Sequence, residues 1–499
     1  MNAPLRKAGV VMMILFGLLF AQLNWIQVYK ADEYRTDDEH NRVRVQQYEY
    51  ERERGRIIVD GEAVAVSEAT KNTLRYLRTY PSEDLYAHVV GYRPVNLAAT
   101  GIERLENEFL NGTADAFAAD RILEMFTGKQ STGGNVVLSI KKRVQEAAYR
   151  GLVNNDTAAK AGAVVAIDPE TGAILAMVST PSFDPNPLVS HNFDEALEAY
   201  RKLEQDPAKP LLNRAIAETF PPGSTFKVIV ATAALRNGLS PTTEITGGET
   251  YTAPTAGQPI RNAPGVSCPD TITLQNALRV SCNTAFARLG VEQLGADAVK
   301  RAAQDFGFET VPSIERDERN VIGVTSSRTG PIQNPDGTED PAVLAQSCIG
   351  QNEVRMTPLQ GALIAAAIAN NGVQMRPYLI DTLQGPDLNR IGGADPEVLR
   401  RPVTPEIAAQ LREMMNSVVS SGTGTNARIE GFEVGGKTGT AETGDDPDHG
   451  WFIGYARKDG RPVVAVAVLL QNAGPGGSAE AAQIAGEVMR AGIAAKGLN

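Results

Sequence analysis

A serine and a lysine three positions apart, Ser224 and Lys227, stand at the start of an apolar segment of helical length. On a helix these side chains share one face, at the end where the helix dipole is positive. A hydroxyl beside an amine suits a serine acyl-transferase whose general base is a lysine. A simpler interpretation makes Ser224 a helix N-cap, so other parts of the sequence must decide.

The same pattern occurs a second time, from Ser139 to Lys142. Residues 135–140 are apolar and β-prone, which predicts a strand, and on a strand positions three apart point to opposite faces. Ser224 instead follows the chain-reversing segment Pro221-Pro222-Gly223 and precedes a predicted helix from Thr225 to Leu235. The surroundings therefore favour Ser224 as the nucleophile.

Two further polar motifs follow along the chain. Ser281 and Asn283 flank Cys282 between two predicted helices, Leu274 to Val280 and Thr284 to Leu294, so their side chains would project from a helix-helix corner. Lys437-Thr438-Gly439-Thr440 lies in a glycine-rich segment whose bare backbone lets a ligand approach.

A rival for the second motif is Ser190-His191-Asn192, which precedes a predicted helix from Asp194 to Leu203. There Ser190 or Asn192 is more simply a helix cap.

With their surroundings, these motifs resemble the penicillin-binding D,D-transpeptidases, over roughly residues 135 to 495. The matching segments are Gly162–Val178, Leu212–Ala215, Pro221–Lys227, Ile349–Gln351, Thr357–Gln360, Lys437–Glu442 and Gly450–Gly454. Upstream, the segments that resemble the non-catalytic pedestal of class B members are Arg54–Ile57, Tyr80-Pro81, Ala87–Tyr92 and Gly101–Glu103. Cys282 departs from the family, since many relatives carry another residue there.

The resemblance implies an α+β fold in which an antiparallel sheet is flanked by helices and joined by an all-helical lobe, with the site in the cleft between them. Together with shifts in composition it predicts three parts. These are a cytoplasmic stub and transmembrane anchor (1–30), a pedestal resembling a dimerisation domain (31–134) and a transpeptidase domain (135–499).

The expected reaction cross-links peptidoglycan stem peptides. Neutral Lys227 would deprotonate Ser224, which attacks the carbonyl of the penultimate D-alanine of a D-Ala-D-Ala end. Ser281 would pass a proton to the leaving amine, while Asn283 orients Lys227 and holds a substrate amide. β-Lactams should acylate the same serine.

The third motif would bind the other end of the substrate. Lys437, Thr438 and Thr440 would receive the terminal carboxylate beside the bare backbone of Gly439. The resemblance further implies an oxyanion hole from the backbone N–H groups of Ser224 and Thr440. An edge strand at Lys437 would let the peptide pair as an added strand.

A septal role is the expectation from overall resemblance, beside a glycosyltransferase of the division or elongation machinery. Two alternatives stay open: a β-lactamase-like hydrolase with the same residues, and a scaffold or wall-precursor sensor in the division machinery.

Composition excludes other classes. The net charge of −11 and the absence of basic patches with interleaved aromatics argue against nucleic acid as a partner. The four histidines are scattered without ligand-like spacing, so neither a metal nor another cofactor is expected.

The segment from Ala8 to Ile26 is apolar and follows Arg6-Lys7, which predicts a single-pass anchor in the cell membrane with an extracytoplasmic catalytic domain. A cleaved signal peptide is the competing interpretation, although no Ala-x-Ala site follows. Residues 31–41 would form a polar stalk.

Export makes a disulfide feasible, and we hypothesise a bond between Cys268 and Cys282, with two buried free thiols as the alternative. Cys348 is expected in the core. Further predicted elements are a hairpin from Ala161 to Ser179, a strand from Val463 to Leu470, a closing helix from Ser478 to Ala495 and a mobile loop from Glu315 to Pro341.

Overall fold

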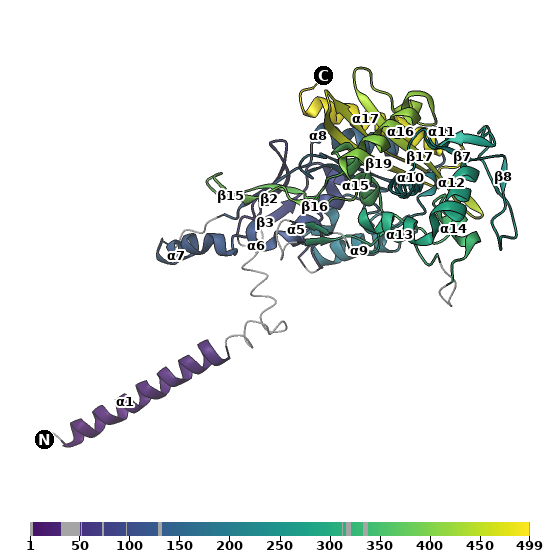
Figure 1. Cartoon of the computed structure of the whole chain (residues 1–499). Helices are drawn as coiled ribbons and strands as arrows, with labels where there is room; N and C mark the ends of the chain where they lie inside the picture. Colours follow the sequence, from purple (N-terminus) through teal and green to yellow (C-terminus); the bar gives the residue numbers. More distant parts are fainter. Residues whose placement is uncertain are drawn as a thin grey trace.

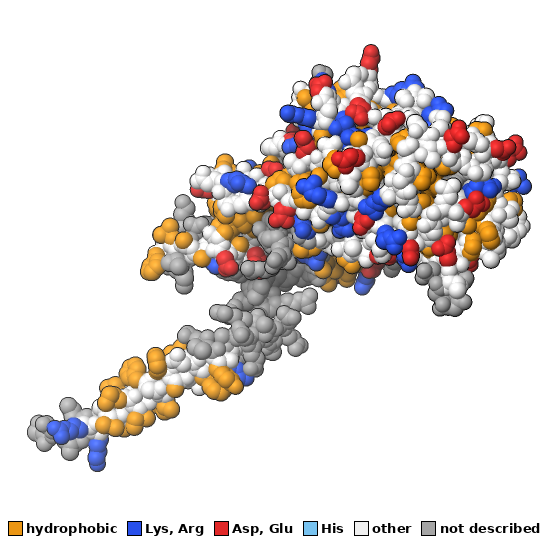
Figure 2. Space-filling view, in the orientation of Figure 1, with side chains coloured by type: hydrophobic (Ala, Val, Ile, Leu, Met, Phe, Trp, Pro, Cys, Tyr) orange, Lys and Arg blue, Asp and Glu red, His pale blue; other side chains and the backbone are white. Residues whose placement is uncertain are grey.

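The computed structural model describes residues 3–30, 50, 52–71, 74–95, 97–127, 132–311, 313–315, 321–332 and 338–498. Helix α1 (Ala3–Asn24) ends in a π-helical turn, Trp25–Tyr29. Its segment Arg6–Asn24 has a mean hydropathy of 1.6 and no buried part. Figure 2 shows apolar side chains along α1 and basic ones at its N-terminal end. By length and composition it is the one helix among the described residues able to cross a membrane. The predicted stalk lies outside these residues.

The pedestal is built on a six-stranded sheet with the order β15-β14-β4-β1-β2-β3. Its strands are β1 (Ile57–Val59), β2 (Glu62–Ala69), β3 (Tyr76–Thr79), β4 (Asn135–Leu138), β14 (Ile380–Gln384) and β15 (Arg390–Gly393). Its helices are α4 (Ala87–Val90), α5 (Gly101–Leu105), α6 (Asn107–Leu110) and α7 (Ala118–Thr127). Buried Glu103 pairs with Arg54 and with Arg78, each at 2.7 Å. Strands β4, β14 and β15 follow residue 134 in the sequence, so this sheet is built from residues on both sides of the predicted domain boundary. The boundary itself stays a prediction.

A second sheet, five-stranded and antiparallel with the order β17-β18-β19-β5-β6, forms the centre of the part of the chain that follows the pedestal. Its strands are β5 (Ala161–Ile167), β6 (Ile174–Thr180), β17 (Glu433–Thr443), β18 (Asp446–Lys458) and β19 (Arg461–Gln471). The predicted 161–179 hairpin and the 463–470 strand are therefore confirmed. Strand β17, which carries Lys437, is an edge of this sheet, and this is the condition under which a peptide could pair with it as an added strand.

Alternate residues of the strands bury two separate cores, one on each face of this sheet. Helices α8 (Lys142–Val153) and α17 (Gly477–Ala495) pack on one face, and α17 confirms the predicted closing helix. On the other face lie α15 (Pro358–Ala369), which is buried along its whole length, and α16 (Pro405–Ser421). Figure 1 shows these helices around the sheet.

A helical lobe continues from the second face. It contains α10 (Lys227–Arg236), α11 (Leu274–Val280), α12 (Asn283–Leu289), α13 (Gly295–Asp305) and α14 (Pro341–Ser347). Helix α9 (Phe193–Glu204) precedes these lobe helices in the sequence. The small two-stranded sheets are β7 (Glu244–Thr246) with β10 (Thr271–Thr273), β8 (Thr250–Tyr251) with β9 (Ile260–Arg261), β11 (Ser313–Glu315) with β12 (Val321–Gly323), and β13 (Gln374–Met375) with β16 (Val398–Arg400). This is the predicted fold class.

Two predicted helices differ in their ends. The segment after Pro222 begins as a 3-10 turn, Gly223–Phe226, and becomes α-helical only at Lys227. The helix after Cys282 ends at Leu289 and continues as a π-helical turn, Gly290–Leu294. The predicted loop from Glu315 to Pro341 contains β12 and lies in part outside the described residues.

Candidate active site

The turn that carries Ser224 is packed onto the backbone of β17. Gly223 has a φ of +51°, and a Cβ there would lie 2.2 Å from the carbonyl oxygen of Thr440. Its N–H donates to the carbonyl of Gly350 at 3.0 Å. The indole N–H of Trp451, on β18, donates to the carbonyl of Pro221 at 2.9 Å. These contacts fix the start of the turn that carries Ser224 against the sheet edge.

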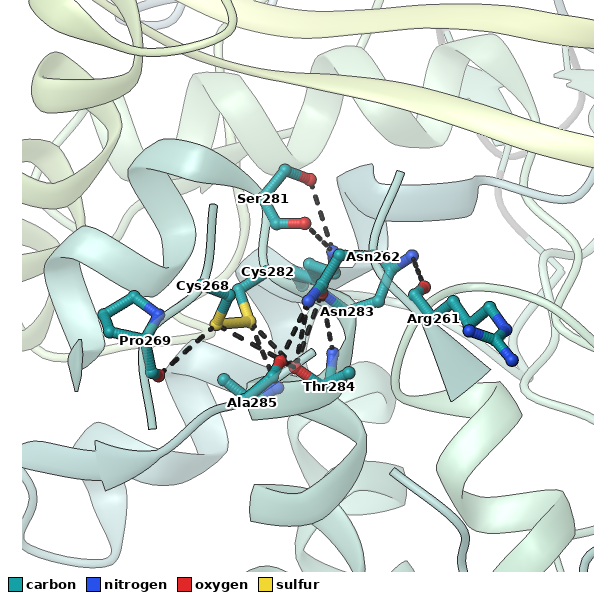
Figure 3. Close-up of a disulfide and its surroundings, with 11 residues drawn as sticks. Arg261, Asn262, Cys268, Pro269, Ser281, Cys282, Asn283, Thr284 and Ala285 are labelled. Atoms are coloured by element: carbon teal, nitrogen blue, oxygen red, sulfur yellow. Dashed lines mark hydrogen bonds between the residues drawn. A yellow bond between two sulfur atoms is a disulfide. The ribbon is translucent and has the colours of Figure 1, made fainter. Parts of the chain in front are cut away.

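The corner between α11 and α12 carries the second motif (Figure 3). Ser281 ends α11 in the left-handed region, with a φ of 63°. Cys282 is the N-cap of α12, and its sulfur accepts from the N–H of Ala285 at 3.3 Å. The corner forms because a residue with positive φ terminates one helix immediately before the next begins.

Lys227 reaches this corner from the first turn of α10. Its amine contacts the carbonyl of Ser281 at 2.8 Å, the hydroxyl of Ser281 at 3.2 Å and Oδ1 of Asn283 at 2.7 Å. The side chain is fully buried, 5.7 Å from the ring of Phe286. Burial first, and the charge of Lys437 second, lower the pKa of Lys227 well below its ordinary value.

Lys437 approaches the same hydroxyl from β17. Its amine contacts Oγ of Ser281 at 2.9 Å and the carbonyl of Thr438 at 2.9 Å. Burial lowers the pKa of Lys437 to about 7. The Ser281 hydroxyl therefore touches two buried amines of lowered pKa, which is the geometry of a proton relay.

Ser224 lines the same cleft as Ser281, Asn283, Thr438 and Thr440. In the part of the chain that the structure describes, its hydroxyl makes no hydrogen bond, and the amine of Lys227 contacts Ser281 and Asn283 instead. The expected Ser224–Lys227 contact is thus absent here. Catalytic hydrogen bonds are commonly long before substrate binds.

The cleft has a volume of about 1160 Å³. Residues 259–264 and Val266 line part of it, with Arg261 as the charged member of that segment. Another part of the lining carries four carboxylates, on Glu442, Asp445, Asp446 and Asp448. A cleft of this size accommodates an extended peptide rather than one amino acid.

The rival motifs lie outside the cleft. Asn192 caps α9 by accepting from the N–H of Asp194, as the simpler interpretation predicts. The strand predicted over residues 135–140 ends at Leu138, so Ser139 lies one residue beyond β4 rather than on it, and its hydroxyl donates to the carbonyl of Ile174 at 2.8 Å. Lys142 begins α8 and pairs with Glu62.

Cys268 and Cys282 form a disulfide in the structure, and Cys348 is a buried free cysteine. Within the described ranges, no group of three or more His, Cys, Asp or Glu residues is arranged to hold a metal ion. His88 and His191 contact backbone carbonyls through Nε2.

Sequence reasoning missed two residues that support the motifs. Thr423 shares a hydrogen bond between hydroxyls with Thr438. Asn262 accepts from the N–H of Asn283 at 2.9 Å. The glycine-rich polar run from Ser420 to Thr425 could have drawn attention to Thr423, whereas nothing local distinguishes Asn262.

The fold and the cleft define a class of protein, the serine acyl-transferases that use lysines. One lysine lies on the edge strand of the antiparallel sheet and the other on a helix of the helical lobe, and residues of that strand and of that lobe line the cleft. A model of the penicillin binding protein transpeptidase domain matches residues 162–490, and one of the penicillin binding protein A dimerisation domain matches residues 54–136. The chain therefore belongs to the penicillin-binding protein transpeptidase family.

Full-length relatives agree. Peptidoglycan D,D-transpeptidase PbpA of Mycolicibacterium smegmatis is 43% identical over 501 residues, and the protein of that name from Mycobacterium tuberculosis is 41% identical, with 99% of each chain covered in both alignments. The structure of M. tuberculosis penicillin-binding protein A as a ceftriaxone acyl-enzyme complex matches with a TM-score of 0.83 and 40% identity, covering 90% of this chain and 100% of that one.

Proposed function

We propose that this protein is a peptidoglycan D,D-transpeptidase that cross-links stem peptides through an acyl-enzyme on Ser224. Relatives that align over 99% of the chain carry that activity in their names. The observation that carries the proposal is the Ser281 hydroxyl, which contacts the amines of Lys227 at 3.2 Å and Lys437 at 2.9 Å in the cleft that Ser224 lines.

In the acylation step, neutral Lys227 takes the proton of the Ser224 hydroxyl. At the same time the hydroxyl oxygen of Ser224 bonds to the carbonyl carbon of the penultimate D-alanine. The backbone N–H groups of Ser224 and Thr440 receive the oxyanion, each contributing about 3 kcal/mol in comparable sites. The packing of Gly223 against the Thr440 carbonyl supports this assignment, because it brings the two backbone segments together.

The peptide C–N bond then breaks, and the proton passes from Lys227 through Ser281 to the departing D-alanine amine. Asn283 positions the amine of Lys227 for this transfer by accepting its hydrogen bond, which measures 2.7 Å in the structure. In the second half-reaction an amine from another stem peptide attacks the ester carbon, and the ester bond to Ser224 breaks. The proton of the attacking amine passes through the same relay to the Ser224 oxygen, which completes the cross-link and restores the enzyme.

Lys437, Thr438 and Thr440 bind the terminal carboxylate of the donor. A carboxylate beside Lys437 favours its charged form and opposes the lowering of its pKa by burial. Strand β17 is the edge of its sheet, so an extended peptide can pair with its free backbone groups. β-Lactams present the same carboxylate and a strained amide, and they acylate Ser224 in place of the substrate.

We further propose that α1 anchors the chain in the cytoplasmic membrane, with its catalytic part outside. The apolar segment Arg6–Asn24 and the basic residues at its start support this orientation. The proposed place of action is the septum, beside a glycosyltransferase of the division machinery; overall resemblance supports it. A fluorescent fusion that follows the lateral wall would contradict the septal role.

Following the mass of the protein with a stem-peptide mimic tests the activity. Mixing with the mimic should give an acyl-enzyme, and an added acceptor amine should convert it to a cross-linked product. If the acyl-enzyme releases only hydrolysed peptide at the same rate with and without the amine, the protein is a hydrolase instead.

A further inference from the structure

Asn262 joins the wall of the cleft to the helix that carries Asn283. It follows β9, and its side chain is half-buried. Its Oδ1 accepts from the backbone N–H groups of Asn283 at 2.9 Å and Thr284 at 3.2 Å, and its Nδ2 donates to the carbonyl of Gly248 at 3.0 Å. Figure 3 shows this side chain directed at the start of α12.

These bonds complete the N-terminus of α12. The first N–H groups of a helix have no partner within it. Asn262 takes those of Asn283 and Thr284, while the sulfur of Cys282 takes that of Ala285. A residue 21 positions away thus supplies most of the cap.

The same short segment also holds the side chain of Asn283. Its Nδ2 donates to the carbonyl of Arg261 at 2.9 Å, and its Oδ1 receives the amine of Lys227 at 2.7 Å. Both the backbone and the side chain of Asn283 are therefore fixed by two consecutive residues, Arg261 and Asn262.

We propose that Asn262 is a positioning residue for acyl transfer: it holds the first turn of α12 so that Asn283 keeps the Lys227 amine in place. The inference rests on the proposed function. A displacement of about 1 Å at a catalytic group can lower a rate by roughly 100-fold, so losing the cap should affect chemistry more than folding.

A charge introduced at position 262 would test the same contact between Asn283 and the Lys227 amine in a second way. Among the described residues, the charged group that bears on Lys227 is Lys437 on β17; the groups facing it from α11 and α12 are the neutral Ser281, Asn283 and Phe286. A carboxylate at position 262 would lie two hydrogen bonds from the Lys227 amine. It would favour the charged amine, so neutral Lys227 would appear only at higher pH.

The test compares Asn262→Ala and Asn262→Asp with Asn192→Ala and Asn192→Asp, since Asn192 caps α9 outside the cleft. The rate of acylation by a fluorescent penicillin is measured against pH, with thermal unfolding in parallel. Asn262→Ala should acylate roughly 10- to 100-fold more slowly than wild type, while Asn192→Ala acylates normally. Asn262→Asp should move the acid limb of the profile to higher pH, and Asn192→Asp should not.

Acylation of Asn262→Ala within twofold of wild type would overturn the inference, as would an acid limb that Asn262→Asp leaves unmoved. If Asn262→Ala does not fold, Asn262→Asp keeps the acceptor oxygen and decides the question. Penicillin labelling of Ser224→Ala separates a failure of the proposed function from a failure of the role of Asn262. If labelling of Ser224→Ala persists, the proposed nucleophile is wrong. If that labelling is lost while the Asn262 variants behave as wild type, only the role of Asn262 fails.

Discussion

Removing the disulfide should lower stability while leaving much of the acylation rate intact. Cys268→Ala opens a cross-link between residues separated by 14 positions in the sequence. In the chain-entropy model, closing a loop of that size lowers the entropy of the unfolded chain and so raises the free energy of unfolding by about 3 kcal/mol. For a domain of roughly 330 residues such as the one matched at residues 162–490, that corresponds to a fall in Tm of about 4 °C.

The acylation rate should change less, because the contacts from Asn262 to Asn283 and Thr284 remain. We expect Cys268→Ala to stay within about fivefold of wild type, and Cys268→Ala with Asn262→Ala to lose more than the two single changes together, because they hold the same helix end.

The assay is thermal unfolding and penicillin acylation without reductant, with Cys348→Ala as the matched control because Cys348 is a buried free cysteine. Non-reduced peptide mapping of the wild type accompanies it. Two free thiols at Cys268 and Cys282 in the wild type, or a Tm for Cys268→Ala equal to that of the control, would refute the reasoning.

Three further changes test the site and the pedestal. Lys437→Gln removes the like charge beside Lys227 and so raises the pKa of Lys227; the base is then neutral only at higher pH, and the acid limb of acylation should move upward, whereas an unmoved limb would contradict the coupling. Glu103→Gln leaves Arg54 and Arg78 buried without a carboxylate and should destabilise by about 3 to 5 kcal/mol in denaturant unfolding; penicillin labelling at 25 °C should be retained, and unchanged stability would contradict the buried pair. Gly439→Ala puts a Cβ 2.8 Å from the carbonyl oxygen of Pro222, and acylation should fall about 100-fold; a normal rate would show that the turn that carries Ser224 is not fixed by β17.

The motifs and their local elements could be predicted because each rests on nearby residues. Pro221–Gly223 predicts a reversal before Ser224, and the apolar stretch after it predicts a helix. The helix ends were less accurate, since Gly223–Phe226 is a 3-10 turn whose shape depends on packing against Gly350 and Thr440.

Contacts between distant segments could not be predicted in this way. Asn262 lies on another element from Asn283, and the pedestal sheet takes up β14 from far along the chain. The position of the Lys227 amine on Ser281 and Asn283 depends on the folded corner, which the Ser-x-x-Lys spacing does not encode.

The identity of the nucleophile is the central claim, and mapping a covalent adduct tests it most directly. Wild-type protein, Ser224→Ala and Ser139→Ala are incubated with penicillin, and the adduct is located by mass spectrometry of the peptides. We predict one adduct, on the peptide containing Ser224, in wild type and Ser139→Ala, and none in Ser224→Ala. An adduct that persists in Ser224→Ala, or that maps to another serine in the wild type, would contradict the account.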